Sequence, residues 1–123
     1  VENGSAKVTL WGSGSPRREF LHVNDLAKAI LKTSENYDSP MHLNIGTGSD
    51  LTIKDLAGKV AAAAGFSGEI EWNTSKPDGT PQKVLDVSKI KALGWEPTIT
   101  LEAGIASTIA WYKEASARGE VRK

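Results

Sequence analysis

The alternation of hydrophobic and polar positions predicts short strands separated by amphipathic helices. β-Branched and aromatic residues over 7–11, just before Gly12, predict a first strand. Residues 18–22 are expected to be extended, residues 42–45 to form a strand that stops at Gly46, and residues 69–72 to form a half-buried strand. Residues 83–87 are a further extended candidate.

Four helices are expected between and after these strands. The first is capped by Asn24, and its buried face is predicted to consist of Val23, Leu26, Ala27, Ile30 and Leu31. The second runs from the cap Thr52 to Gly65, and the third is short, starting at Ser88. The fourth follows the cap Thr100. The pattern therefore predicts an α/β fold with α+β character, forming one small domain over residues 1–123.

Composition restricts the function. Fifteen basic and fifteen acidic residues cancel, so the net charge gives no support to field-driven binding of nucleic acid or membrane. No apolar run approaches the ~20 residues that span a bilayer. The absence of cysteine excludes disulfides and thiolate metal sites and is compatible with the cytoplasm. His22 and His42 stand alone, so no metal site is predicted. The start at Val1, with no initiator Met, predicts a cut inside a longer protein.

The stretch from residue 11 to residue 27 carries the first candidate chemistry. It passes from a strand through a Gly-Ser-Pro loop to Arg17 and Arg18 and then enters a helix. Neither this loop nor Gly46-Thr47-Gly48 continues as G-x-G-x-x-G, so the glycines predict tight turns rather than a dinucleotide site. The arginines suit bidentate phosphate contacts, or they pair with nearby carboxylates. Both alternatives stay open from the residues alone.

A second candidate is the irregular segment 75–82, which two prolines and a glycine interrupt. Lys76, Asp78 and Lys83 lie on or beside it and either meet a sugar and a phosphate or form an ordinary Pro-Asp-Gly turn with solvated charges. Trp11 either stacks on a base or packs in the core. No Tyr-x-x-x-Lys, G-x-S-x-G or paired-carboxylate pattern is present. The residues therefore indicate a ligand-binding domain, with no catalytic or cofactor-binding residue of its own.

Three stretches carry a family resemblance. Residues 11–27, with Arg-Glu-Phe-Leu-His-Val-Asn-Asp-Leu-Ala, resemble the signature of the substrate-binding part of the extended short-chain dehydrogenase/reductase family of nucleotide-sugar enzymes. Residues 42–48 match its Asn-hydrophobic-Gly-Thr-Gly turn. Residues 75–86 and 93–105 resemble one branch in particular, the enzymes that make GDP-L-fucose from GDP-4-dehydro-6-deoxy-D-mannose with NADPH.

The resemblance implies a function for named residues. It places Trp11, Arg18 and Asp78 on substrate-contacting positions and makes Lys83 a diphosphate contact. It also implies that NADP is bound by an N-terminal Rossmann domain that is absent here, together with the family's catalytic Ser, Tyr, Lys, Cys and His residues. The chain alone is therefore expected to be inactive. The parent is expected to be an oxidoreductase and isomerase, and a homodimer that takes a GDP-sugar.

Two other functions are kept open. One retains the fold and makes the parent a nucleotide-sugar 4-epimerase or 4,6-dehydratase, which would recycle its cofactor. The other is a free-standing nucleotide-binding module without catalysis, because the sequence shows no catalytic set.

Overall fold

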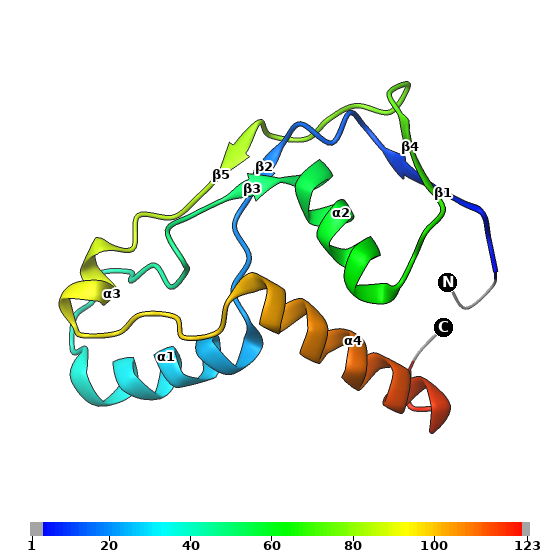
Figure 1. Cartoon of the computed structure of the whole chain (residues 1–123). Helices are drawn as coiled ribbons and strands as arrows, with labels where there is room; N and C mark the ends of the chain where they lie inside the picture. Colours follow the sequence, from blue (N-terminus) through cyan, green and yellow to red (C-terminus); the bar gives the residue numbers. More distant parts are fainter. Residues whose placement is uncertain (1–3, 122–123) are drawn as a thin grey trace.

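The computed structural model describes residues 4–121, in which helices are mixed with two small sheets (Figure 1). In chain order the elements are β1 (Lys7–Trp11), β2 (Arg17–Arg18), α1 (Val23–Asn36), β3 (Leu51–Thr52), α2 (Ile53–Ala64), β4 (Glu69–Asn73), β5 (Gln82–Lys83), α3 (Ser88–Ala92) and α4 (Leu101–Ala117). The predicted fold class, with helices covering few short strands, is confirmed.

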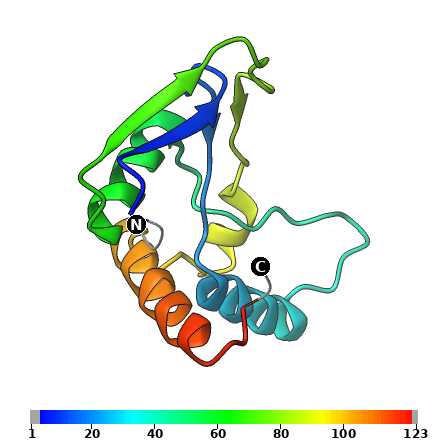
Figure 2. The same cartoon turned by 90° about the vertical axis from the view of Figure 1, so that its right-hand side faces the viewer.

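The first sheet joins the two longest strands. β1 runs parallel to β4, from Lys7 opposite Glu69 to Trp11 opposite Asn73. The helix α2 precedes β4 in the chain and lies along this pair (Figure 2). The predictions of strands over 7–11 and 69–72 are confirmed, the second with one more residue.

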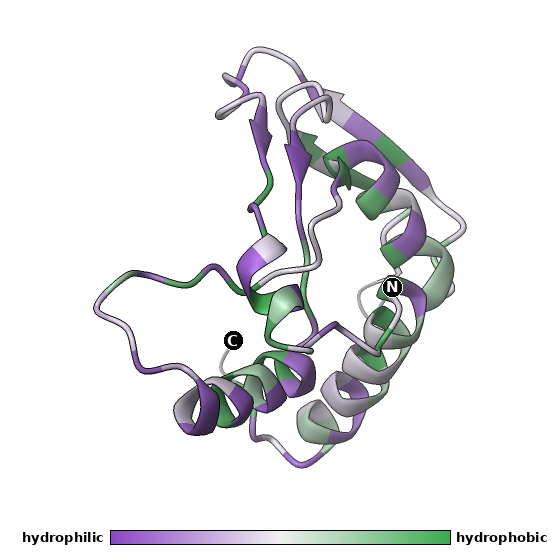
Figure 3. Cartoon of the chain, turned by 90° about the vertical axis from the view of Figure 1, so that its left-hand side faces the viewer, coloured by the Kyte–Doolittle hydropathy of each residue, from purple (hydrophilic) through white to green (hydrophobic). Residues whose placement is uncertain are grey.

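The second sheet is shorter and more polar. Its strand order is β3-β2-β5, with β2 antiparallel to β3 and parallel to β5. Figure 3 shows β2 and β5 as neighbouring hydrophilic strands. The extended segments expected at 18–22 and 83–87 join this sheet only at 17–18 and 82–83. Two arginines thereby lie on the central strand β2 and a lysine lies on the edge strand β5 of a sheet that has little apolar surface.

Local capping sets the ends of the helices largely as predicted. The Thr52 hydroxyl accepts a hydrogen bond from the Asp55 N–H (3.0 Å), and Gly65 ends α2 in the left-handed conformation at φ 72°. Thr100 caps α4 in the same way. The prediction of Asn24 as the cap of α1 is wrong, because His22 is the cap and its Nδ1 accepts from the Asn24 N–H. No helix in the described part of the chain has the length and hydropathy to cross a bilayer.

The predicted buried face of α1 is wrong for this chain. Val23 and Leu31 are 68% and 67% exposed, and the helix instead buries Ala29 and Asp25, the latter 1% exposed. The Asp25 carboxylate accepts hydrogen bonds from Thr98 and from the Ile99 N–H at 2.8–2.9 Å, which turns its side of the helix inward. Burial alone would raise the pKa of Asp25, but these hydrogen bonds outweigh it, so the pKa lies below its ordinary value.

The strand predicted over residues 42–45 does not form. A strand exists by pairing, and no described strand lies beside this segment. Its Asn44 side chain donates to the Asp86 carbonyl (3.1 Å) instead. Leu43 and Ile45 pack against the buried cluster described next.

The core is small and lies where α3 meets α1. Its buried members are Ala29, Val87, Ile90 and Trp95, with Ile90 fully buried. Outside this core, the α2 and α4 helices pack against each other with half-buried apolar side chains. Between these regions the second sheet is held mainly by hydrogen bonds, which leaves its strand residues accessible.

Candidate functional site

The loop between β1 and β2 is compact because two glycines occupy conformations that favour glycine. Gly12 and Gly14 are buried at φ 81° and 77°. A Cβ at Gly14 would lie 2.7–2.9 Å from three ring atoms of Trp72, and a Cβ at Gly12 would overlap the Asp78 carboxylate. The prediction that these glycines make a tight turn is confirmed. Gly46 and Gly48 also lie at bends of the backbone, but no described strand leads into them.

Asp78 joins the two candidate segments. One carboxylate oxygen accepts from the Ser13 N–H (2.8 Å) and the other from the Ser13 hydroxyl (2.7 Å). These hydrogen bonds, the side-chain one first, hold the pKa of Asp78 below its ordinary value. Although 65 positions separate the two residues, the proline-glycine segment is thereby fastened to the glycine loop. The placement of Asp78 in contact with substrate stays a prediction.

Arg17 is held by other parts of the protein. Its guanidinium donates to the Asp50 carboxylate (Nε–Oδ1 2.8 Å) and to the Asp50 carbonyl (3.2 Å), and the Gln82 amide donates to the other Asp50 oxygen. The hydrogen bonds from Gln82 and then Arg17 lower the pKa of Asp50. The partner of Arg17 is therefore Asp50, which lies 33 positions away and is not one of the carboxylates near it in the sequence. Arg17 fastens Asp50, the residue just before β3, to β2, and Gln82 of β5 bonds to the same carboxylate independently.

Arg18 and Lys83 are the positive charges of the second sheet that no described carboxylate neutralises. They are register partners on the parallel strands β2 and β5. Within residues 4–121, no carboxylate forms an ion pair with either side chain. Like charges facing one another on neighbouring strands are destabilising. An anion between the two side chains would remove that repulsion, so this pair is suited to a phosphate or diphosphate.

Trp11 lies at the end of β1 with its side chain in solvent. It is 75% exposed, which is unusual for so large an apolar group. The Lys76 ammonium lies 5.5 Å from the centroid of its ring, within cation–π range. Trp11 therefore does not pack in the core formed by residues 4–121. The ring offers a flat surface on which a base or a sugar can stack.

Two hollows flank Arg18. A cavity of about 190 Å³ is lined by residues that include Trp11, Arg18 and Asp78. A second, of about 510 Å³, is lined by residues that include Arg18, Glu19 and Lys83. The four predicted site residues are thus brought together around Arg18, although they lie up to 72 positions apart in the sequence.

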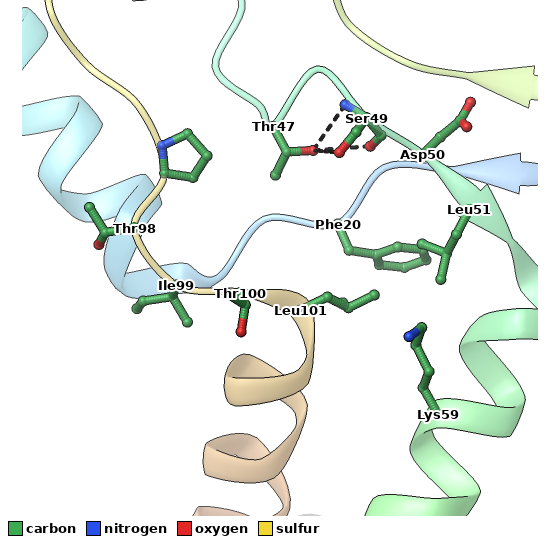
Figure 4. A pocket seen from close by; sticks show the side chains of 11 residues that line it. Phe20, Thr47, Ser49, Asp50, Leu51, Lys59, Thr98, Ile99, Thr100 and Leu101 are labelled. Carbon is green, nitrogen blue, oxygen red and sulfur yellow. Dashed lines mark hydrogen bonds between the residues drawn. The ribbon is translucent and has the colours of Figure 1, made fainter.

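Another cavity, of about 420 Å³, lies between α2 and the start of α4 (Figure 4). It contains none of the four predicted residues. Both of its charged side chains are already paired, Lys59 with Glu102 (2.6 Å) and Asp50 with Arg17. No group of three or more metal-ligating side chains occurs among the described residues. This cavity therefore offers less free chemistry than the hollows beside Arg18.

Two polar residues of the site region escape sequence reasoning. Asp50 decides the role of Arg17 from 33 positions away, and Glu19 binds backbone groups of two remote segments. The signal for Glu19 is Gly46, because the missing side chain there leaves room for the Glu19 carboxylate to approach the backbone. No signal in the sequence joins Asp50 to Arg17.

Comparison with known proteins places this geometry in context. Residues 1–46 match the model of the NAD dependent epimerase/dehydratase family. Over 112 residues, 91% of the chain, it is 48% identical to the probable GDP-L-fucose synthase 1 of Oryza sativa subsp. japonica and covers 34% of that protein. It is 47% identical to the GDP-L-fucose synthase of Escherichia coli strain K12 over 87% of the chain and 36% of that protein. The resemblance to the nucleotide-sugar enzymes is confirmed.

The fold agrees with this resemblance. The structure of a GDP-L-fucose synthetase from Naegleria fowleri bound to NADP superposes with a TM-score of 0.89 at 28% identity, over 98% of this chain and 38% of that one. The chain spans about a third of the length of the curated relatives it matches. What it resembles is therefore a part of a GDP-L-fucose synthase.

Proposed function

We propose that residues 1–123 are the GDP-sugar-binding domain of a GDP-L-fucose synthase. The observation that carries the proposal is the pair of cations Arg18 and Lys83, which are held in register and have no acidic partner among residues 4–121. The exposed ring of Trp11 lines a cavity together with Arg18. The guanidinium and the ammonium bind the diphosphate, Trp11 provides a stacking surface, and Asp78 fixes the loop and contacts a sugar hydroxyl. The similarity to the rice and Escherichia coli enzymes supports GDP as the nucleotide.

The remaining two thirds of the protein supply the chemistry. NADPH, when bound there, would supply the hydride that reduces a 4-keto GDP-sugar. No described residue is assigned to NADP. The role of this chain is to hold the nucleotide diphosphate so that the sugar reaches that cofactor, and this part alone has no activity.

The surface of the chain supports a covering domain. Its accessible area is 8540 Å², whereas a folded monomer of 13.1 kDa is expected to expose about 6,400 Å². The apolar side of α1, with Val23, Ile30 and Leu31 more than half exposed, contributes to this excess. We propose that the N-terminal Rossmann domain covers α1, that the whole protein is a homodimer, and that it works in the cytoplasm.

The experiment is an assay of the full-length protein. NADPH oxidation is followed with GDP-4-dehydro-6-deoxy-D-mannose and with the corresponding UDP and dTDP 4-keto sugars. The proposal expects turnover with the GDP-sugar and little with the other two. Activity confined to UDP- or dTDP-sugars, or interconversion of a sugar without net NADPH consumption, would contradict it and favour a 4-epimerase or 4,6-dehydratase. GDP binding without any turnover would favour a non-catalytic module.

A further inference from the structure

Glu19 follows Arg18 directly and uses both of its carboxylate oxygens. Oε1 accepts hydrogen bonds from the Gly48 N–H and from the Thr47 hydroxyl (3.1 Å). Oε2 accepts from the Leu85 N–H at 2.9 Å. The two backbone donors lie 29 and 66 positions away in the sequence. One half-buried side chain therefore ties three segments together.

The turn beside Thr47 is shaped to receive this carboxylate. Gly46 is buried, and a Cβ built on it would overlap Glu19 Oε1 and lie 2.9 Å from the carboxylate carbon. Since Gly46 has no positive φ, this close approach, and no backbone requirement, calls for glycine there. The turn binds a side chain of its own protein.

The tie to Leu85 matters because β5 is short. Only Gln82 and Lys83 pair with β2, so the sheet itself fixes little of the chain after Lys83. Leu85 comes two residues later, and its bond to Glu19 continues the attachment beyond the end of the sheet. The chain is thus attached at Lys83 itself by strand pairing and two residues later by the bond from Leu85 to Glu19.

We propose that Glu19 is a positioning residue of the diphosphate site: its carboxylate fastens the segment that follows β5 and so holds Lys83 beside Arg18. The inference rests on the proposed function, because it assumes that the two cations bind the diphosphate. Glu19 lines the same cavity as Arg18 and Lys83, but its oxygens are turned to backbone donors, so it acts on the ligand through Lys83.

The test measures GDP affinity of the full-length protein by titration calorimetry in a double-mutant cycle. Glu19→Gln exchanges one acceptor oxygen for a donor facing an N–H, and it is combined with Lys83→Ala. Asp25→Asn is the matched control, because Asp25 also accepts two backbone N–H bonds but lies on α1. Thr47→Val, which removes a single hydrogen bond to Glu19, is the milder variant should Glu19→Gln not fold.

In the wild-type background, Glu19→Gln is expected to weaken GDP affinity about tenfold. In the Lys83→Ala background, the same substitution is expected to cause almost no further loss of affinity. Thr47→Val is expected to show a smaller loss that likewise disappears, and Asp25→Asn to lower the melting temperature without changing GDP affinity. Equal losses in both backgrounds, or a lower melting temperature with unchanged affinity, overturn the inference. A wild-type protein that does not bind GDP overturns the proposed function instead.

Discussion

Two adjacent arginines give the sharpest prediction, because the structure assigns them opposite surroundings. Arg17 is bonded to the Asp50 carboxylate, whereas Arg18 forms no ion pair within the described residues and donates only to the Arg17 carbonyl (2.7 Å). Truncation of each to alanine in the full-length protein removes the same chemical group. We expect Arg18→Ala to weaken GDP binding and Arg17→Ala to leave it nearly unchanged.

The size of the effect follows from the bonds that are lost. A hydrogen bond to a charged group contributes about 1.5–3 kcal/mol, which corresponds to a roughly 10- to 150-fold change in Kd. Arg18→Ala is expected in that range, and Arg18→Lys in between, since lysine keeps the charge and loses the planar fork. Arg17→Ala leaves the backbone pairing of β2 with β5 and the Gln82–Asp50 hydrogen bond in place, and it does not touch the bond between Glu19 and Leu85, so its Kd should stay within about twofold.

The assay is titration calorimetry with GDP and with GDP-mannose, with circular dichroism to check that each variant is folded. Equal effects of the two alanine variants would refute the assignment, as would a larger effect of Arg17→Ala. Negligible effects of both would remove Arg18 from the site and with it the reason for placing the diphosphate between β2 and β5.

Three further predictions concern the packing that supports the site. Ile90→Ala deletes three carbons from a fully buried side chain. At about 0.8 kcal/mol per methylene plus a cavity term, it should lower the free energy of unfolding by about 3 kcal/mol, measured by urea titration. A loss under about 1 kcal/mol would contradict the core described here. The pKa of Asp25 lies below its ordinary value, so its stabilising effect is present above the unfolded pKa of about 3.9 and is lost as the pH falls through the folded value. In a plot of the free energy of unfolding against pH, Asp25→Asn should therefore flatten the decline at acid pH. An unchanged decline would contradict this role of Asp25. A Cβ at Gly79 would lie 3.2 Å from an Arg18 guanidinium nitrogen, so Gly79→Ala should weaken GDP binding severalfold at unchanged melting temperature, whereas Gly58→Ala, with open space around it, should not; equal Kd values for the two would count against the placement of Arg18.

The sequence predicted those parts of the fold that depend on neighbouring residues. Thr52 and Thr100 begin helices and Gly65 ends one, each through hydrogen bonds within one turn, so their roles follow from local chemistry. The segment 42–45 has the composition of a strand but needs a partner strand, which no local pattern supplies. The apolar stripe of α1 was correctly recognised as a stripe, but its burial depends on what lies against it, and Asp25 determines which side faces this chain's core.

The same distinction holds for the site. Trp11, Arg18, Asp78 and Lys83 were singled out from motifs, and the fold gathers them around two hollows. The residues alone could not separate Arg18 from Arg17, because the two have the same chemistry and only the position of Asp50 decides between them. Contacts between residues tens of positions apart depend on the tertiary structure, and residue type and local pattern do not predict them.

The most direct test of the central claim is the location of the bound nucleotide in the full-length protein. Hydrogen–deuterium exchange is measured with and without saturating GDP-mannose. The account predicts slower exchange in peptides covering residues 11–18 and 76–85, with α1 and the C-terminal half of α4 unchanged. Tight binding of GDP-mannose with protection confined to other parts of the protein would show that the diphosphate site does not lie between β2 and β5.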